Sequence, residues 1–147
     1  MKFILILVAI LAGMSLPVQA VLNAKMGKAL GDPIYASLIS FVFGAISMFI
    51  YALITKVNLG AINQAANVHW SVWLAGTMGA FYVTAVIILT PKLGAALAFS
   101  LVTAGQLGVA IILDHYGWLG MPVHIISWPR LVGILLVTVG VVIIHKF

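Results

Sequence analysis

The sequence predicts an all-α integral membrane protein with five transmembrane helices. Of its 147 residues, 65% are hydrophobic and only 6% are charged, so the chain cannot build the mixed, charged surface of a soluble domain. The apolar residues gather in five long stretches, and a helix needs about 20 apolar residues to cross roughly 30 Å of hydrocarbon. Five crossings use nearly the whole length and leave no room for a soluble catalytic domain. We therefore expect a single five-helix transmembrane domain over residues 1–147.

Short polar or turn-forming breaks separate the five predicted spans. The spans lie at about residues 3–24, 34–55, 72–89, 95–113 and 131–144. Gly31-Asp32-Pro33 ends the first helix and starts the second, and the polar segment Asn58–Trp70 follows the second span. Thr90–Gly94 reads as a tight turn, which predicts an antiparallel hairpin of spans three and four. The longest connection, Asp114–Pro129, precedes span five. The four tryptophans fall near span ends, as an interfacial aromatic belt predicts: Trp70, Trp73, Trp118 and Trp128.

The N-terminal segment has a second interpretation. Lys2, an apolar stretch and Pro17-Val18-Gln19-Ala20 together resemble a signal peptide with a small-residue cleavage site. Cleavage there would leave four spans. Because apolar character continues through Val21 and Leu22, we expect the first span to be retained.

The positive charges are spread almost evenly over the two ends of the predicted helices. Five spans place the termini on opposite sides of the membrane, with three Lys/Arg residues on one side and four on the other. The first set is Lys2, Lys56 and Arg130, and the second is Lys25, Lys28, Lys92 and Lys146. Lys and Arg near span ends are the usual signals that orient a membrane protein in the bilayer. They account for the net charge of +5, so we expect membrane lipid as a partner and no nucleic acid.

A difference of one charge gives only a weak orientation bias. One interpretation is that the chain inserts both ways and pairs with itself as an antiparallel homodimer, which would reproduce the inverted repeat of many transporters. The other is that a modest bias still sets one orientation. The charge count leaves both open.

Polar side chains within the spans mark a candidate substrate pathway, because such groups usually face protein or a water-filled cavity. The amides bring donors and acceptors that hydrocarbon cannot satisfy, and a proline removes a backbone donor from the first span. The pathway candidates are Pro17, Gln19, Asn23, Tyr82, Ser100, Thr103 and Gln106. Hydrogen bonds between helices are the alternative role. For the stripe of Ser37, Ser40 and Ser47 we favour plain helix packing.

Three further residues have predicted roles. Gly133 and Gly140 lie seven residues apart on one face of the aliphatic fifth span and form a candidate dimer interface. Asp114 is the acid that is a candidate for ion coupling. Its alternative role is solvation of the helix end, paired with Arg130 or a lysine.

The histidines show no close ligand pair. No nucleophile–base pair or phosphate-binding glycine loop is present, so we expect no enzyme, no catalytic residue, no metal and no cofactor.

Short motifs along the whole chain resemble one known family. They are Pro17-Val18-Gln19-Ala20 with Asn23-Ala24 and Leu30-Gly31; Ala36-Ser37-Leu38-Ile39-Ser40-Phe41 with Gly44; Gly79-Ala80-Phe81-Tyr82-Val83 with Pro91-Lys92-Leu93-Gly94; Gly105-Gln106 with Asp114-His115; and Trp128 with Arg130-Leu131. Together they resemble the bacterial YdcZ-like branch of the drug/metabolite transporter superfamily.

The resemblance implies a multi-pass protein of the bacterial inner membrane that corresponds to half of a ten-helix transporter. Members look like single dual-topology proteins, pairs of opposite orientation, or fused two-domain proteins, which favours the antiparallel dimer here. The small multidrug resistance proteins, which are more distant, use an intramembrane glutamate. This chain contains no glutamate, so their proton-exchange mechanism does not carry over.

Three functions are compatible with these features. The leading hypothesis is a homodimeric secondary transporter of an unidentified small molecule, working by alternating access. The second is a passive pore for a small ion or solute, lined by the same polar residues. The third is a membrane subunit that transports nothing itself.

Overall fold

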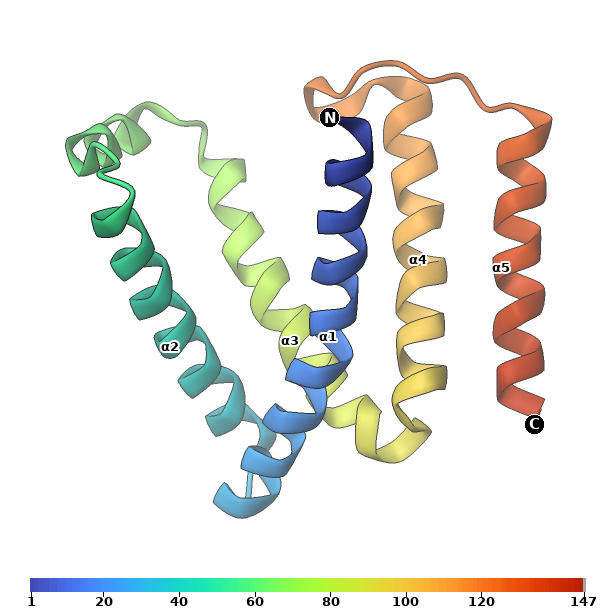
Figure 1. Ribbon diagram of the computed structural model, residues 1–147, viewed down its shortest axis with the longest axis horizontal. Helices are drawn as coiled ribbons and strands as arrows, with labels where there is room; N and C mark the ends of the chain where they lie inside the picture. The colour runs from blue at the N-terminus through green and yellow to red at the C-terminus, as the bar shows by residue number, and fades with distance from the viewer. Residues whose placement is uncertain (147) are drawn as a thin grey trace. The chain divides into compact units, whose positions relative to one another are not determined.

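The computed structural model describes residues 1–146, which contain five long apolar helices and no strand (Figure 1). The helices are α1 (Lys2–Leu30), α2 (Pro33–Ile54), α3 (Leu74–Leu93), α4 (Ala95–Tyr116) and α5 (Trp128–Lys146). Each is long and apolar enough to cross a membrane, α3 together with the short turn before it. The predicted fold class, an all-α membrane protein with five spans, is confirmed.

Helix α1 is longer than its predicted span because it continues past residue 24 to Leu30. Its 29 residues reach about 43 Å at 1.5 Å per residue, more than the hydrocarbon thickness. The helix ends at Gly31, whose φ of 83° is the left-handed conformation that glycine adopts without strain. Asp32 then caps α2 by accepting the Ile34 N–H at 2.7 Å, and Pro33 occupies the first turn, where proline is tolerated.

The connection before α3 is partly helical, and the connection after α3 is shorter than predicted. The polar segment after α2 is ordered as two 3₁₀ helices, η1 (Leu59–Asn67) and η2 (Trp70–Trp73). The turn predicted over Thr90–Gly94 is narrower, because α3 continues through Pro91 to Leu93 and only Gly94, with φ of 80°, separates it from α4. Pro91 has no backbone N–H, so it removes one i→i−4 hydrogen bond from the last turn of α3.

The chain divides into two compact units, the first from Met1 to Pro91 and the second from Lys92 onward. The single five-helix domain and the hairpin of spans three and four therefore stay predictions.

In the first unit, α1 and α2 approach each other closely near the Gly31 turn and diverge toward their other ends (Figure 1). A Cβ atom added to Gly27 would lie 3.1 Å from Pro33 Cα and 3.6 Å from Ala36 Cβ. Buried residues concentrate in the last half of α1, the first turns of α2 and the last half of α3. They are Ala20, Asn23, Gly27, Ala36, Ser37, Val86, Ile87 and Thr90.

In the second unit, α4 and α5 lie side by side (Figure 1). They are joined by the short 3₁₀ helix η3 (Trp118–Gly120) and an extended segment that leads to Trp128. The buried residues of these two helices are Ala98 and Val141.

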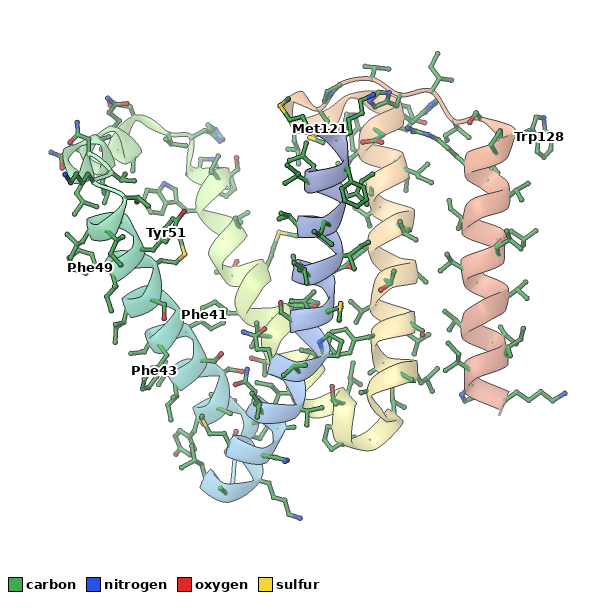
Figure 2. The ribbon with its side chains drawn as sticks, in the orientation of Figure 1. Phe41, Phe43, Phe49, Tyr51, Met121 and Trp128 are labelled. Carbon is green, nitrogen blue, oxygen red and sulfur yellow. The ribbon has the colours of Figure 1, made fainter. Side chains whose placement is uncertain are left out.

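Most of the apolar side chains are exposed. In the most apolar window of each candidate span, only 6–11% of the residues are buried. Figure 2 shows Phe43 and Phe49 projecting outward from α2, and they are 67% and 56% exposed. A surface this apolar would be unstable in water, so lipid or another protein must cover these helices.

Candidate functional site

Two side-chain hydrogen bonds join the three helices of the first unit. Asn23 on α1 donates through Nδ2 to Ser40 Oγ on α2 at 3.1 Å. One turn away on α2, the Ser37 hydroxyl shares a hydrogen bond with the Thr84 hydroxyl of α3 at 2.8 Å. We call Asn23, Ser37, Ser40 and Thr84 the polar cluster. All four side chains are uncharged.

The sequence brings the polar cluster together through small residues. Gly27 lies one turn after Asn23 and lets the backbone of α1 approach Pro33 and Ala36. Ser37 and Ser40 are three residues apart and share one face of α2. Close helix approach at small residues, reinforced by polar side chains, is the usual packing mode of membrane helices.

The polar cluster does not satisfy all of its hydrogen-bonding groups. Asn23 is only 6% exposed, and its amide carries two N–H donors and one carbonyl acceptor. Its only hydrogen bond among the described residues is the one to Ser40, so Oδ1 has no partner there. The hydroxyls of Tyr82 and Thr90 are also buried and without a hydrogen-bond partner over residues 1–146.

The remaining pathway candidates do not join this cluster. On α1, Pro17 is half-buried inside the continuous helix and Gln19 is exposed. On α4, Ser100 donates to the Ala96 carbonyl at 2.8 Å, which is a bond within its own helix. Thr103 and Gln106 are exposed, and neither side chain makes a hydrogen bond within the described part of the chain.

Ser37, Ser40 and Thr84 make interhelical contacts that the pathway prediction omitted. The serine stripe of α2 was the signal for Ser37 and Ser40 in the sequence, but a stripe does not say which of its members bond across helices. Ser47, in the same stripe, donates to Phe43 O of its own helix at 2.8 Å.

A second set of contacts closes the α4–α5 connection. Asp114 Oδ2 lies 3.4 Å from an Arg130 guanidinium nitrogen, so the predicted pairing of these residues is confirmed. The same nitrogen donates to His124 O at 3.2 Å, and the His124 N–H donates to Asp114 O at 2.8 Å. His115 Nδ1 accepts the Ile126 N–H at 3.2 Å. These bonds tie the connection back to the end of α4.

The described residues supply no group of three or more His, Asp or Glu that could hold a metal ion. On α5, a Cβ atom added to Gly133 or Gly140 would have no neighbour within 4 Å. That face of α5 is therefore open within the second unit.

The comparisons with known proteins agree with this architecture. A family model described as "Putative inner membrane exporter, YdcZ" matches residues 4–143. The chain belongs to the YdcZ family. It is also 27% identical over 132 residues to the "Inner membrane protein YdcZ" of Escherichia coli (strain K12), covering 89% of this chain and 87% of that protein. No solved structure matches.

Membership in the YdcZ family confirms the resemblance seen in the motifs. The family description is that of a membrane exporter and not of an enzyme. With its five apolar helices, this chain is a multi-pass membrane protein of a transporter family.

Proposed function

We propose that this chain is a secondary transporter of small organic molecules in the bacterial inner membrane. Two copies of opposite orientation form an antiparallel homodimer that works by alternating access. The family match supports export across a membrane. The proposal of a dimer rests on the nearly equal numbers of Lys and Arg residues at the two ends of the five helices.

Helix positions support that balance, because the charged residues lie at or near helix ends. Lys25 and Lys28 lie in the last turns of α1, Lys56 follows α2, and Arg130 lies in the first turn of α5. Counted with Lys2, Lys92 and Lys146, three cations lie at one end of the helices and four at the other. Orientation follows the Lys/Arg difference between the two sides, and here that difference is small.

A second copy in the opposite orientation would supply the inverted repeat that one five-helix copy lacks. The two copies would be related as the inverted repeats of many transporters are, with the substrate site near the interface of the repeats. Pro17, Gln19, Asn23 and Tyr82 would contribute from the first unit. From the second unit come Ser100, Thr103 and Gln106, with Asp114 as the candidate coupling residue.

Orientation labelling tests the dimer directly. The chain has no cysteine, so Phe3→Cys and His145→Cys give clean single-thiol variants that keep every lysine and arginine. In intact cells, an impermeant thiol reagent should label part of each population. Labelling of one variant only, with the other protected, would exclude dual topology.

Flux measurements separate a transporter from the other two functions. Saturable counterflow of a labelled solute in proteoliposomes is expected for a transporter, whereas flux that rises without saturation indicates a pore. Gln19→Ala and Gln106→Ala should lower that counterflow without changing dimer yield, a result that a non-transporting subunit would not give.

The open face of α5 is the proposed dimer contact. Leucine at both Gly133 and Gly140 should block close approach of a second copy and lower the cross-linked dimer yield. Gly105→Leu on α4 is the matched control, because its Cβ also has no neighbour within 4 Å. An unchanged yield in the double variant would remove α5 from the interface.

A further inference from the structure

Two consecutive residues near the end of α4, Asp114 and His115, hold the connection that runs from α4 to α5 (Figure 1). The Asp114 carbonyl accepts the His124 N–H at 2.8 Å, and the Asp114 carboxylate accepts from Arg130 at 3.4 Å. His115 Nδ1 accepts the Ile126 N–H at 3.2 Å. Of these three bonds, only the one at His115 depends on a type of side chain whose ordinary charge change lies between about pH 5 and 8.

This bond requires the neutral ring of His115. A backbone N–H can only donate, so Nδ1 must accept through a free lone pair, and the ring proton then lies on Nε2. Protonation makes both ring nitrogens donors. Nδ1–H would then face the Ile126 N–H, and two donors cannot bond each other. The connection therefore loses one of its attachments to α4 when His115 gains a proton.

The charged and titratable groups around His115 do not replace the lost bond. Within the second unit they are Asp114 and Tyr116 on α4, His124 in the connection and Arg130 on α5. Asp114 is the single acid in the sequence of this unit, and it is already paired with Arg130. The Tyr116 ring meets the His115 ring edge-on at 4.8 Å. A positive His115 therefore finds no unpaired carboxylate here, and its charge has the same sign as that of Arg130.

The connection has little else to hold it in place. Leu119 has φ of 58°, a left-handed conformation that is unfavourable for a residue other than glycine and persists only where its surroundings impose it. Leu119 and Ile125 are 90% and 73% exposed, so burial of their side chains contributes little. A segment with few buried contacts opens locally at low cost. The hydrogen bonds to α4 therefore maintain this conformation, and loss of one should let the connection move.

We propose that His115 is a proton-binding site that controls the conformation of the α4–α5 connection. While His115 is neutral, the connection is held against the end of α4. As pH falls and His115 gains a proton, the Ile126 N–H is released and the connection becomes mobile. The site acts in the folded chain whether or not the chain transports a solute. In the proposed antiparallel dimer, the two copies would present it to opposite sides of the membrane, so a pH difference would release one connection and not the other.

A nitroxide spin label on the connection measures this mobility, and the absence of cysteine from the chain allows one labelled position at a time. Ile125→Cys places the label beside the His115 bond on an exposed residue. The full chain in nanodiscs is titrated over the range of histidine, from about pH 8 to about pH 5. The ratio of mobile to immobile label should rise about five-fold as pH falls, the effect expected for loss of one hydrogen bond. A label at Val109→Cys, exposed on α4, should not change.

Three substitutions in the Ile125→Cys protein assign the response to one histidine. His115→Asn keeps an acceptor oxygen at the δ position and cannot gain a charge, so the label should stay immobile throughout the titration. His115→Leu has no acceptor, so the label should be mobile throughout. His124→Gln is the matched control, because His124 contributes only its backbone N–H and carbonyl to these contacts. The pH response of that variant should equal the response of the unsubstituted protein.

Several results would overturn this assignment. They are a label at residue 125 that does not respond to pH, a response that survives in His115→Asn or His115→Leu, and a response that His124→Gln abolishes. An equal change at Val109 would show that α4 itself unfolds, which contradicts a local switch. Because the measurement uses no solute, a failure of counterflow would reject the proposed transport function and leave this result unaffected.

Discussion

The two units of this chain are held by different chemistry. In the first unit, uncharged side chains bond between helices within the membrane-spanning region, at Asn23–Ser40 and Ser37–Thr84. In the second, an ion pair and backbone hydrogen bonds tie a connection to the end of α4. The first arrangement needs close helix approach, and the second needs a tightly folded loop.

This difference follows from the solvent each region meets. Within hydrocarbon a charge is expensive, whereas neutral hydroxyls and amides bond at short range once small residues admit them. At a helix end, water and headgroups solvate ions, so Asp114 and Arg130 keep side-chain exposures of 27% and 35%. Glycine is central to both regions: Gly27 permits close packing, and Gly117 permits a left-handed turn.

The largest expected effect is at Gly27. Leucine there should separate α1 from α2, because even a Cβ would lie 3.1 Å from the Pro33 backbone. Overpacking of this kind destabilises by about 3 kcal/mol. The measurement is the midpoint of SDS-induced unfolding in mixed micelles. Gly13→Leu, on the same helix with open space around its Cβ, should change the midpoint little. Equal shifts in the two variants would show that α1 and α2 do not pack at Gly27.

The corresponding test of the second unit is Gly117→Ala. Gly117 has φ of 62°, and its added Cβ would lie 2.7 Å from Val123 Cγ2. Backbone strain and the clash together should destabilise the α4–α5 connection by about 2 kcal/mol. Gly120→Ala isolates the backbone term, since Gly120 has φ of 79° but open space around its Cβ. The measurement is the protection of the α4–α5 connection from a protease. Equal protection in the two variants would show that the Val123 contact does not contribute to the destabilisation.

The sequence predicted the five spans because membrane insertion depends on apolar length, which is a local property. For Asp114 it offered helix-end solvation, paired with Arg130 or a lysine, as the alternative to ion coupling, and the structure pairs Asp114 with Arg130. The helix break at Gly31-Asp32-Pro33 was also predicted and is confirmed, while α1 continues six residues past the predicted membrane span, which ended at about residue 24. A helix does not have to end where its apolar stretch ends.

The candidate site was harder to predict, because hydrogen bonds between helices depend on rotation and register. Asn23 was predicted either to line the pathway or to bond between helices. The structure gives it an interhelical partner, and its role in a pathway stays a prediction. Ser40 and Ser47 lie in the same stripe, yet one bonds α1 and the other bonds its own backbone. That distinction requires the neighbouring helix. The roles of Gln19, Thr103 and Gln106 stay predictions for the same reason.

A smaller effect is expected for the Ser37–Thr84 hydrogen bond. A double-mutant cycle with Ser37→Ala and Thr84→Val should give a coupling free energy of about 0.6 kcal/mol, the average for such bonds in membranes. Unfolding in mixed micelles measures it, and the coupling should not depend on salt. Ser47→Ala with Thr84→Val is the control cycle, because Ser47 bonds Phe43 O. Coupling in the control as large as in the test pair would rule out a specific Ser37–Thr84 contact.

The smallest effect is expected for the Asp114–Arg130 ion pair, despite its opposite charges. Because both side chains are about one-third exposed, water and salt screen their attraction, and such pairs contribute about 0.5 kcal/mol or less. A cycle with Asp114→Asn and Arg130→Gln measures the coupling by the same unfolding method.

The salt dependence decides between the two kinds of contact. At 1 M salt the screening length falls to about 3 Å, so the Asp114–Arg130 coupling should nearly vanish while the Ser37–Thr84 coupling persists. A salt-independent Asp114–Arg130 coupling above about 1 kcal/mol would place this pair in a medium of low polarity. Asp114 would then be a buried charge held by Arg130, and its role as a coupling residue would become the stronger interpretation, because a buried carboxylate within a membrane protein is retained mainly for function.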